Sequence, residues 1–313
     1  MQKKCILTVK AAHSLHMDNY AKIKYRYFFF SFSAAFFILS LTFLFLVATV
    51  RPIIPDSLAK EPEIDDGASV YIPKKEDSLT VLFIGAPPDL TSAGTLMIVR
   101  FDPVSGHIPV IVLPPETAVQ NAGKLEPFSE VYRYGGAAYA KEALSETLGI
   151  PVDRYVRMSP ESFIKAVDMV GFVEFNLPEP VTIARGGAPV VLNRGKQLLD
   201  GQKSADVITY GGYPGGADER LFIMGDLTAA LINQRMDICL SIVVDNVFEK
   251  IINLVSTDIS YSDYHARKPA AEFLAKLGND PAYPVEVSGE WNDARSLYVL
   301  NDTFHAKLSQ IMR

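Results

Sequence analysis

The stretch "LGIPVDRYVRMSPESFIKAVDMVGFVEFNLPEPV", residues 148–181, shows how helices and strands alternate in this chain. Ser159 and Pro160 fit the N-cap and the first position of a helix whose apolar residues recur at helical spacing. Gly171 ends that helix, and an alternating apolar run at 172–178 predicts a strand. A strand that directly follows a capped helix is typical of α/β proteins.

The residues before this stretch predict the sheet that the helices cover. Near-continuous apolar runs occupy 79–85, 95–101 and 108–113, and the last two are joined by a predicted hairpin at 105–107. Strands without polar alternation are usually buried on both faces. A helix is predicted over 137–148, because its apolar residues share one face and Gly-Ile-Pro follows it.

The C-terminal half continues the alternation. Helices are predicted at about 218–235 and 237–254, strands at 283–291 and 296–301, and a closing helix from Asp302. We therefore predict one α/β domain with helices on both faces of the sheet. The glycine-rich segment 210–219 lacks the lysine of a phosphate-binding loop and is interpreted as a mobile loop.

An uncharged segment precedes the domain. "YFFFSFSAAFFILSLTFLFLVATV", residues 27–50, contains no charged residue. As a helix it would measure about 36 Å, enough to cross a hydrocarbon core of about 30 Å. Residues 1–26 carry six basic residues and one acid, which favours a cytoplasmic tail and an exported domain. We predict a tail at 1–26, a transmembrane helix at 27–50, a linker at 51–77 and the α/β domain at 78–313.

Charge and cysteines narrow the classes of function. Of the 30 basic and 36 acidic residues, 24 and 35 follow the tail, a formal balance of −11 for the exported part. Such a balance argues against nucleic acid as a partner. Cys5 and Cys239 fall on opposite sides of the predicted membrane, which rules out a disulfide or thiolate metal site within one chain. Cys239 is interpreted as a buried small hydrophobe.

The opening stretch also resembles the LytR-CpsA-Psr (LCP) family of bacterial envelope proteins. The shared features are a Gly-Ile-Pro-hydrophobic-Asp turn, a helix with a Val-Asp pair, a glycine, and a strand that ends in proline. "LVSTDIS" at 254–260 and the closing strand–helix unit resemble the end of such domains. The order of elements agrees along 78–313. The resemblance implies a three-layer fold, a mixed sheet between helices, behind one N-terminal transmembrane helix.

The resemblance also implies an activity. Family members are phosphotransferases that move undecaprenyl-pyrophosphate-linked glycopolymers onto peptidoglycan outside the membrane, with the lipid tail in an apolar channel. The family binds the pyrophosphate with a magnesium ion, held by two aspartates, and with several arginines. Such cations offset charge on phosphoryl oxygens, and the guanidinium fork matches phosphate geometry.

This sequence departs from the family at the charged positions. Pro87 and Gly94 stand where the resemblance places the two metal-binding aspartates, although Thr95 after the second is kept. Pro115 stands at an arginine position, and Thr209 at another.

The family's Arg-Ile-Glu-Arg-Gln-Gln motif corresponds to 220–225. Its first arginine is kept as Arg220, its second is Ile223, and its glutamines are Met224 and Gly225. Each lost charge-assisted contact is worth roughly 1.5–3 kcal/mol, so three lost arginines would weaken phosphate binding by about 4.5–9 kcal/mol.

A few candidate site residues are left. Arg220 is the functional side chain that the resemblance carries over, and an ion pair with Asp218 or Glu219 is its structural alternative. Lys124, Thr95 and Glu116 are further candidates for binding phosphate or lipid.

The metal site has weaker candidates. Asp89 and Glu116 are the substitutes for a weak cation site, and otherwise they are a solvated loop acid and a helix-start acid.

Two functions from different classes follow. The first is a membrane-anchored extracytoplasmic protein of cell-envelope glycopolymer assembly that is non-catalytic or strongly divergent and binds a polyprenyl-linked lipid or an envelope partner, with no cofactor. The alternative is an active glycopolymer phosphotransferase, for which Mg²⁺ is expected.

Overall fold

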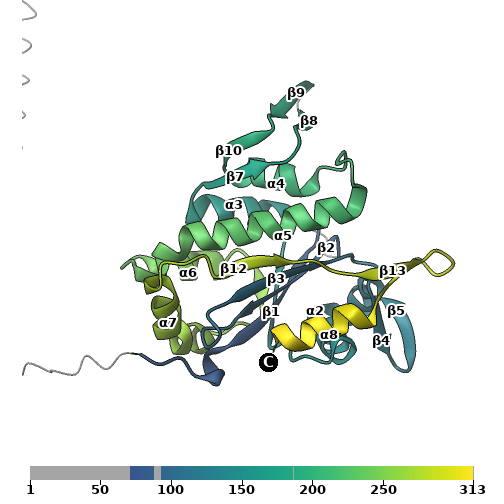
Figure 1. Cartoon of the computed structure of the whole chain (residues 1–313), viewed down its shortest axis with the longest axis horizontal. Coiled ribbons are helices and arrows are strands. Elements are labelled where there is room, and N and C mark those ends of the chain that lie inside the picture. Colours follow the sequence, from purple (N-terminus) through teal and green to yellow (C-terminus); the bar gives the residue numbers. More distant parts are fainter. Residues whose placement is uncertain (1–70, 88–92, 186, 313) are drawn as a thin grey trace, which may run out of the picture. The chain divides into compact units, whose positions relative to one another are not determined.

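A computed structural model describes residues 71–87, 93–185 and 187–312 (Figure 1). They belong to one compact unit, Ser69–Arg313. Within these residues no helix is both long and apolar enough to cross a membrane. The predicted tail, the transmembrane helix at 27–50 and most of the linker lie outside the described residues. The boundary predicted at 77/78 stays a prediction.

The centre of the domain is a mixed six-stranded sheet in the order β11-β6-β1-β2-β3-β12. β1 pairs antiparallel with β2 and β2 with β3, whereas β1–β6 and β3–β12 are parallel. The three strands predicted from apolar runs are confirmed to the residue. The sheet strands are β1 Leu79–Gly85, β2 Thr95–Phe101, β3 Ile108–Leu113, β6 Arg154–Met158, β11 Ser256–Thr257 and β12 Ala282–Val285.

Helices cover both faces of this sheet, as predicted (Figure 1). On one face, α2 (Phe128–Leu148) and α8 (Asp302–Ile311) pack on side chains that are fully buried. On the other, α5 (Gly216–Arg235) packs on β3 and β12, and α3 (Pro160–Val170) contacts β6. Burial on both faces explains why the strands carry apolar residues at consecutive positions. The three-layer mixed fold is confirmed.

Smaller elements surround these layers. Three hairpins and one further strand pair lie outside the main sheet, together with three more helices and two 3-10 turns. These elements are the hairpins β4 Ala118–Asn121 with β5 Lys124–Pro127, β8 Val181–Arg185 with β9 Ala188–Leu192, and β13 Gly289–Asn292 with β14 Leu297–Leu300; the pair β7 Val173–Leu177 with β10 Gly195–Leu199; α4 Gly201–Thr209, α6 Val244–Ile252 and α7 Tyr261–Lys276; and the 3-10 turns η2 Lys75–Asp77 and η3 Met236–Leu240.

Local signals set the ends of several elements. The Ser159 hydroxyl accepts the Ser162 N–H at 3.1 Å and caps α3, as predicted. Gly171 follows α3 with a φ of 107°, a conformation that favours glycine. The Asn301 side chain accepts the Phe304 N–H at 2.9 Å and begins α8 at the predicted residue.

Three predicted elements were wrong in their extent. The helix predicted at 137–148 begins at Phe128 and passes through Gly136, whose φ of 72° is not helical, so the kink concealed its first turns. The helix predicted over 237–254 is η3 followed by α6, separated at Ser241–Val243, where β-branched residues disfavour a helix. The strand predicted at 283–291 is β12 and β13, which pair in different sheets.

The motifs that carry the family resemblance hold the backbone together. In the Gly-Ile-Pro-Val-Asp turn, the Asp153 carboxylate accepts the Thr80 N–H at 2.8 Å. The Asp168 carboxylate of the Val-Asp pair accepts the Gly201 N–H at 2.7 Å and joins α3 to α4. These carboxylates have structural roles.

Candidate functional site

Several of the family's charged positions lie together at one edge of the sheet. Gly85 pairs with Thr95, and Leu96 pairs with Leu113, so β1 ends where β2 begins and β3 ends. The loops that follow or precede these ends carry Pro87, Gly94 and Pro115. We call this region the strand-end site, and it comprises Pro87, Gly94, Thr95, Pro115, Glu116 and Arg220.

The β1–β2 side of the strand-end site is closed by backbone contacts. The Gly94 N–H donates to Gly85 O at 2.8 Å. A Cβ at Gly85 would lie 3.0 Å from the Thr95 Cβ, so the threonine side chain packs against the bare backbone of Gly85. Thr95 is half-buried and belongs to the face of the sheet that α5 covers. A proline and a glycine at the two metal positions offer no carboxylate.

The end of β3 is a rigid turn. Thr117 donates its hydroxyl to Pro114 O at 2.6 Å, and the Ser129 N–H donates to Pro115 O at 2.9 Å. The Tyr298 N–H donates to Glu116 O at 3.0 Å. Pro115 therefore keeps the geometry of the strand end without supplying a cation. The Glu116 carboxylate is half-buried and forms no ion pair with any described residue.

Helix α5 brings Arg220 to the same edge. The Asn233 side chain exchanges hydrogen bonds of 2.8 and 2.9 Å with Ala282, which pairs with Ile108 at the start of β3. Eight residues earlier, a Cβ on Gly225 would lie 3.5 Å from Val112 and 3.3 Å from Pro284. The helix therefore runs antiparallel to β3, and its N-terminal turns reach the end of that strand. The close approach to β3 and β12 explains a glycine inside this helix.

Arg220 is half-buried, and its Nε has no hydrogen-bond partner among the residues that the structure describes. The structural alternative, an ion pair with Asp218 or Glu219, is not formed among the described residues. Glu219 instead accepts the Gly215 N–H at 2.6 Å at the start of α5. Burial, and then the charge of Asp218, raise the pKa of Tyr298.

The other positions of the family's arginine motifs lie away from the strand-end site. Ile223 is buried between α5, α4 and β7, and Met224 is buried against the α5 face of β3. Thr209 is exposed at the end of α4, where its hydroxyl donates to Ala205 O at 2.7 Å. Packing accounts for Ile223 and Met224.

Lys124 lies outside the strand-end site, and its role in binding phosphate or lipid stays a prediction. It stands at the tip of the β4–β5 hairpin, opposite Asn121. Four residue pairs of a hairpin separate it from the end of β3, about 13 Å. Lys124 instead faces an open cleft of about 740 Å³ that Arg295 also lines.

The described residues contain no group of three or more His, Cys, Asp or Glu side chains able to hold a metal ion. Asp89 lies outside the described residues, so its pairing with Glu116 stays a prediction. Of the predicted site residues, the structure brings Thr95, Glu116 and Arg220 to one edge.

An apolar strip runs from the strand-end site along the sheet. On β1 and β2, the side chains that face α2 are fully buried, including Leu82, Ile84, Leu96 and Ile98. Those on the α5 face are mostly half-buried, and the register joins them into a strip about 20 Å long. The apolar strip consists of Leu79, Phe83, Met97, Val99 and Phe101.

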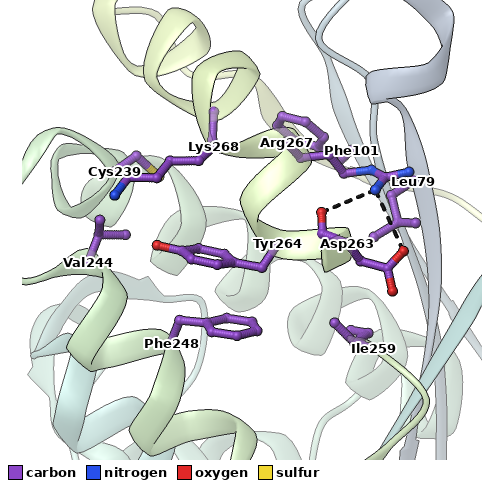
Figure 2. A pocket seen from close by; sticks show the side chains of 11 residues that line it. Leu79, Phe101, Cys239, Val244, Phe248, Ile259, Asp263, Tyr264, Arg267 and Lys268 are labelled. Carbon is purple, nitrogen blue, oxygen red and sulfur yellow. Dashed lines mark hydrogen bonds and ion pairs between the residues drawn. The ribbon is translucent and has the colours of Figure 1, made fainter. Parts of the chain in front are cut away.

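A pocket of about 230 Å³ lies at the far end of the apolar strip (Figure 2). We call it the α7 pocket. Figure 2 shows the rings of Phe248 and Tyr264 facing each other, with centroids 4.0 Å apart. Its lining residues are Leu79, Phe101, Cys239, Val244, Phe248, Ile259, Asp263, Tyr264, Arg267, Lys268 and Ala271.

The charged side chains of the α7 pocket already have partners. Asp263 accepts two hydrogen bonds of 2.9 Å from Arg154, which hold the pKa of the Asp263 carboxyl well below its usual range. Lys268 pairs with Asp245 at 2.9 Å. Cys239 is half-buried rather than buried, and burial raises the pKa of its thiol. The space is therefore suited to an apolar group.

Sequence reasoning missed Arg157. It lies on β6 beside Ile84 near the same edge, and its Nε is buried without a partner in the described part of the chain. Because it shares the α2 face with Ile84, it is on the opposite side of the sheet from Arg220. The missed signal was a second arginine in β6, besides Arg154, which pairs with Asp263.

The fold and the site define a three-layer α/β protein with a strand-end site that continues into an apolar strip. Residues 53–313 match the model of the LytR_cpsA_psr family. The chain therefore belongs to the LytR-CpsA-Psr family.

Curated relatives agree with this membership. The polyisoprenyl-teichoic acid–peptidoglycan teichoic acid transferase TagU of Bacillus subtilis is 23% identical over 218 residues, which cover 67% of this chain and 68% of TagU. An uncharacterized protein of Staphylococcus aureus is 23% identical over 150 residues, 42% of this chain and 36% of that protein. The chain thus matches only about a third of the length of the staphylococcal relative.

Solved structures show the same fold. Bacillus subtilis TagV superposes with a TM-score of 0.63 at 20% identity, covering 76% of this chain and 97% of TagV. A protein of Eubacterium siraeum, described as a putative transcription regulator, gives a TM-score of 0.69 at 16% identity and covers 79% and 95%. At these identities the likeness extends to the fold alone.

Proposed function

We propose that this chain is a divergent LCP protein of cell-envelope glycopolymer assembly that binds a polyprenyl-linked lipid without transferring its cargo. The observation that carries the proposal is the pairing of a half-buried apolar strip with a strand-end site whose metal positions are Pro87 and Gly94. The relative TagU is named for a polyisoprenyl-linked substrate, which supplies the class of ligand.

The apolar strip supports the lipid part of the proposal. Its side chains are half-buried, so a hydrocarbon tail along the strip would remove further apolar surface from water. Each 100 Å² buried in this way is worth about 2.5 kcal/mol. The α7 pocket extends the strip with aromatic and aliphatic side chains whose charged neighbours are already paired.

The strand-end site supports the absence of transfer. Phosphoryl transfer depends on cations that neutralise the developing charge. Pro115 and Thr209 stand at two arginine positions, and Ile223 at a third is buried in the core. A diphosphate would therefore be held mainly by Arg220, and weak anchoring of its charge is expected.

A specific observation favours the alternative, an active phosphotransferase. Arg220 has an unpartnered Nε, and it lies in the second turn of α5, near the positive end of that helix. Glu116 keeps a carboxylate at the same edge, where Mg²⁺ would need oxygen ligands. In this reading Glu116 would help to hold Mg²⁺, and Arg220 would bind the diphosphate.

One experiment separates the two functions. The full chain is purified in detergent, its co-purified lipid is identified by mass spectrometry, and release of glycopolymer from an undecaprenyl-pyrophosphate donor is followed with Mg²⁺ and with chelator. Bound lipid without turnover, unchanged by chelator, supports the binder. Magnesium-dependent turnover that is lost in Arg220→Ala overturns it in favour of the transferase.

The lipid-binding surface has a matched test. Val99→Glu places a charge in the apolar strip, whereas Val191→Glu places the same charge on the exposed face of the β8–β9 hairpin. We expect the first variant to lose the co-purified lipid and the second to keep it. Equal lipid content in both variants would rule out the strip as the binding surface.

The proposal includes a topology, with one membrane anchor at 27–50, a cytoplasmic N-terminus and an exported domain. It is supported by the uncharged 24-residue segment and the basic tail. In a Cys239→Ser background, a membrane-impermeant thiol reagent should label Cys5 only after the cells are permeabilised. Labelling of Cys5 in intact cells would mean that the N-terminus lies outside the cell.

A further inference from the structure

An exposed apolar surface lies beside the α7 pocket. Ile242 is 99% exposed, and its neighbours Leu240 and Val243 are about half exposed, as is Tyr261 at the start of α7. We call these four residues the α6 patch. Single exposed apolar residues are ordinary, but a contiguous group on a connecting segment marks an interaction surface.

The α6 patch is continuous with the α7 pocket. Cys239 and Val244, on either side of the exposed segment, both line the pocket. The ring of Tyr261 lies 6.5 Å from Phe248 and 5.9 Å from Tyr264, which also line it. Helix α6 has no fully buried residue, although Val244, Val247, Phe248, Ile251 and Ile252 share one face. The domain itself does not cover this surface.

The chain enters the domain at the same place. Arg267 of α7 donates hydrogen bonds of 3.3 and 3.4 Å to the carbonyls of Glu76 and Ser78. The ring of Tyr71 lies 6.3 Å from that of Phe273, also on α7. Leu79, the first residue of β1, lines the pocket. In Figure 1, α6 and α7 lie together at this end of the domain.

The length of the preceding chain limits how far this end lies from the membrane. Residues 51–70 join the described domain to the uncharged segment 27–50. Fully extended, a chain of this length spans at most about 70 Å. If the predicted anchor is present, this length limits how far the α7 end, where the chain enters the domain, can lie from the bilayer.

We propose that the α6 patch docks on the surface of the lipid bilayer, with Ile242 inserted into the interface. The docking rests on the predicted anchor and does not depend on any activity of the strand-end site. It places the mouth of the α7 pocket against the membrane and the strand-end site about 20 Å farther along the sheet. The exported part has a formal charge of −11, so apolar insertion holds the patch and anionic lipid does not attract it.

The single tryptophan, Trp291, makes the test direct. The full chain is reconstituted in phosphatidylcholine vesicles with or without brominated acyl chains, which quench nearby indoles. Ile242→Trp is combined with Trp291→Phe. The controls are the native chain, whose Trp291 on β13 is 47% exposed, and Val191→Trp with Trp291→Phe. We expect quenching of the Ile242→Trp indole alone, at a depth of about 5–10 Å in the interface.

Each other result overturns the docking. Unquenched emission from both Ile242→Trp and a second placement, Val243→Trp, means that the patch does not reach lipid. Equal quenching of all indoles means that the domain has no fixed face toward the bilayer. A blue shift that grows with protein concentration but not with brominated lipid assigns the patch to a second copy of this chain. None of these results changes the lipid mass spectrometry that tests the proposed function.

Discussion

Substitution of Gly201 by alanine tests whether the close contact between α3 and α4 stabilises the fold. Gly201 is the first residue of α4, and it lies directly against Ile164 of α3. An added Cβ would overlap the Ile164 carbonyl oxygen and would lie 2.8 Å from its carbonyl carbon, closer than real Cβ atoms approach backbone. The Gly201 N–H also donates to the Asp168 carboxylate at 2.7 Å. Alanine must therefore push α3 and α4 apart.

The magnitude follows from these two contacts. Overpacking at a well-packed site costs about 1–3 kcal/mol, and a hydrogen bond to a charged group is worth about 1.5–3 kcal/mol. Because the helices relax together and the terms overlap, we expect Gly201→Ala to lower the free energy of unfolding by about 2–5 kcal/mol. For a domain of this size that lowers the melting temperature by about 4–20 °C.

The assay is thermal unfolding of the full chain in detergent, followed by circular dichroism at 222 nm. Gly211→Ala is the matched control, because no atom lies within 4 Å of its added Cβ, and a change within about 0.5 kcal/mol is expected there. If the two variants melt at the same temperature, the close α3–α4 contact is refuted, and Gly201 needs another explanation.

Three further predictions concern charge and reactivity. Arg154 lowers the pKa of Asp263 in the folded state, so this pair stabilises the fold at pH values above the unfolded pKa of about 3.9. That contribution is lost as the pH falls below the unfolded pKa. In acid unfolding titrations, Asp263→Asn should therefore flatten the loss of stability below about pH 4, and an unchanged slope would contradict the pairing. Because burial raises the pKa of Cys239, iodoacetamide should label it at pH 8 more slowly than an exposed thiol in a Cys5→Ser background, and equal rates would show an open site. Pro115→Arg should strengthen binding of a polyprenyl diphosphate by about tenfold or more, as titration calorimetry would measure; no gain would mean that the end of β3 does not face the diphosphate.

Much of the fold could be predicted from sequence because its signals are local. The apolar runs of β1, β2 and β3 have the length and composition of buried strands, and the structure gives them the predicted bounds. The caps of α3 and α8 depend on residues within a few positions of the helix ends. Helix α7 was missed because Pro269 interrupts its apolar pattern. Its N-terminal capping box, formed by Ser260 and Asp263, was the local signal that could have predicted it.

The candidate site was predictable only in part. The sequence alone showed which positions lack the family's charges, because Pro87, Gly94 and Pro115 can be named without coordinates. It also led to Arg220, which the structure places at the strand edge. It could not show that the β4–β5 hairpin carries Lys124 away from the end of β3.

By itself, then, the sequence determined the strands, the main caps, the uncharged N-terminal segment and the loss of charge at named positions, all of which depend on residue type and near neighbours. Only the tertiary structure decided that α5 runs antiparallel to β3, that Ile223 and Met224 enter the core, and that an apolar strip leads to the α7 pocket. These features depend on contacts between segments far apart in the chain. Such contacts are set by how whole helices pack on the sheet, which no short stretch of residues specifies.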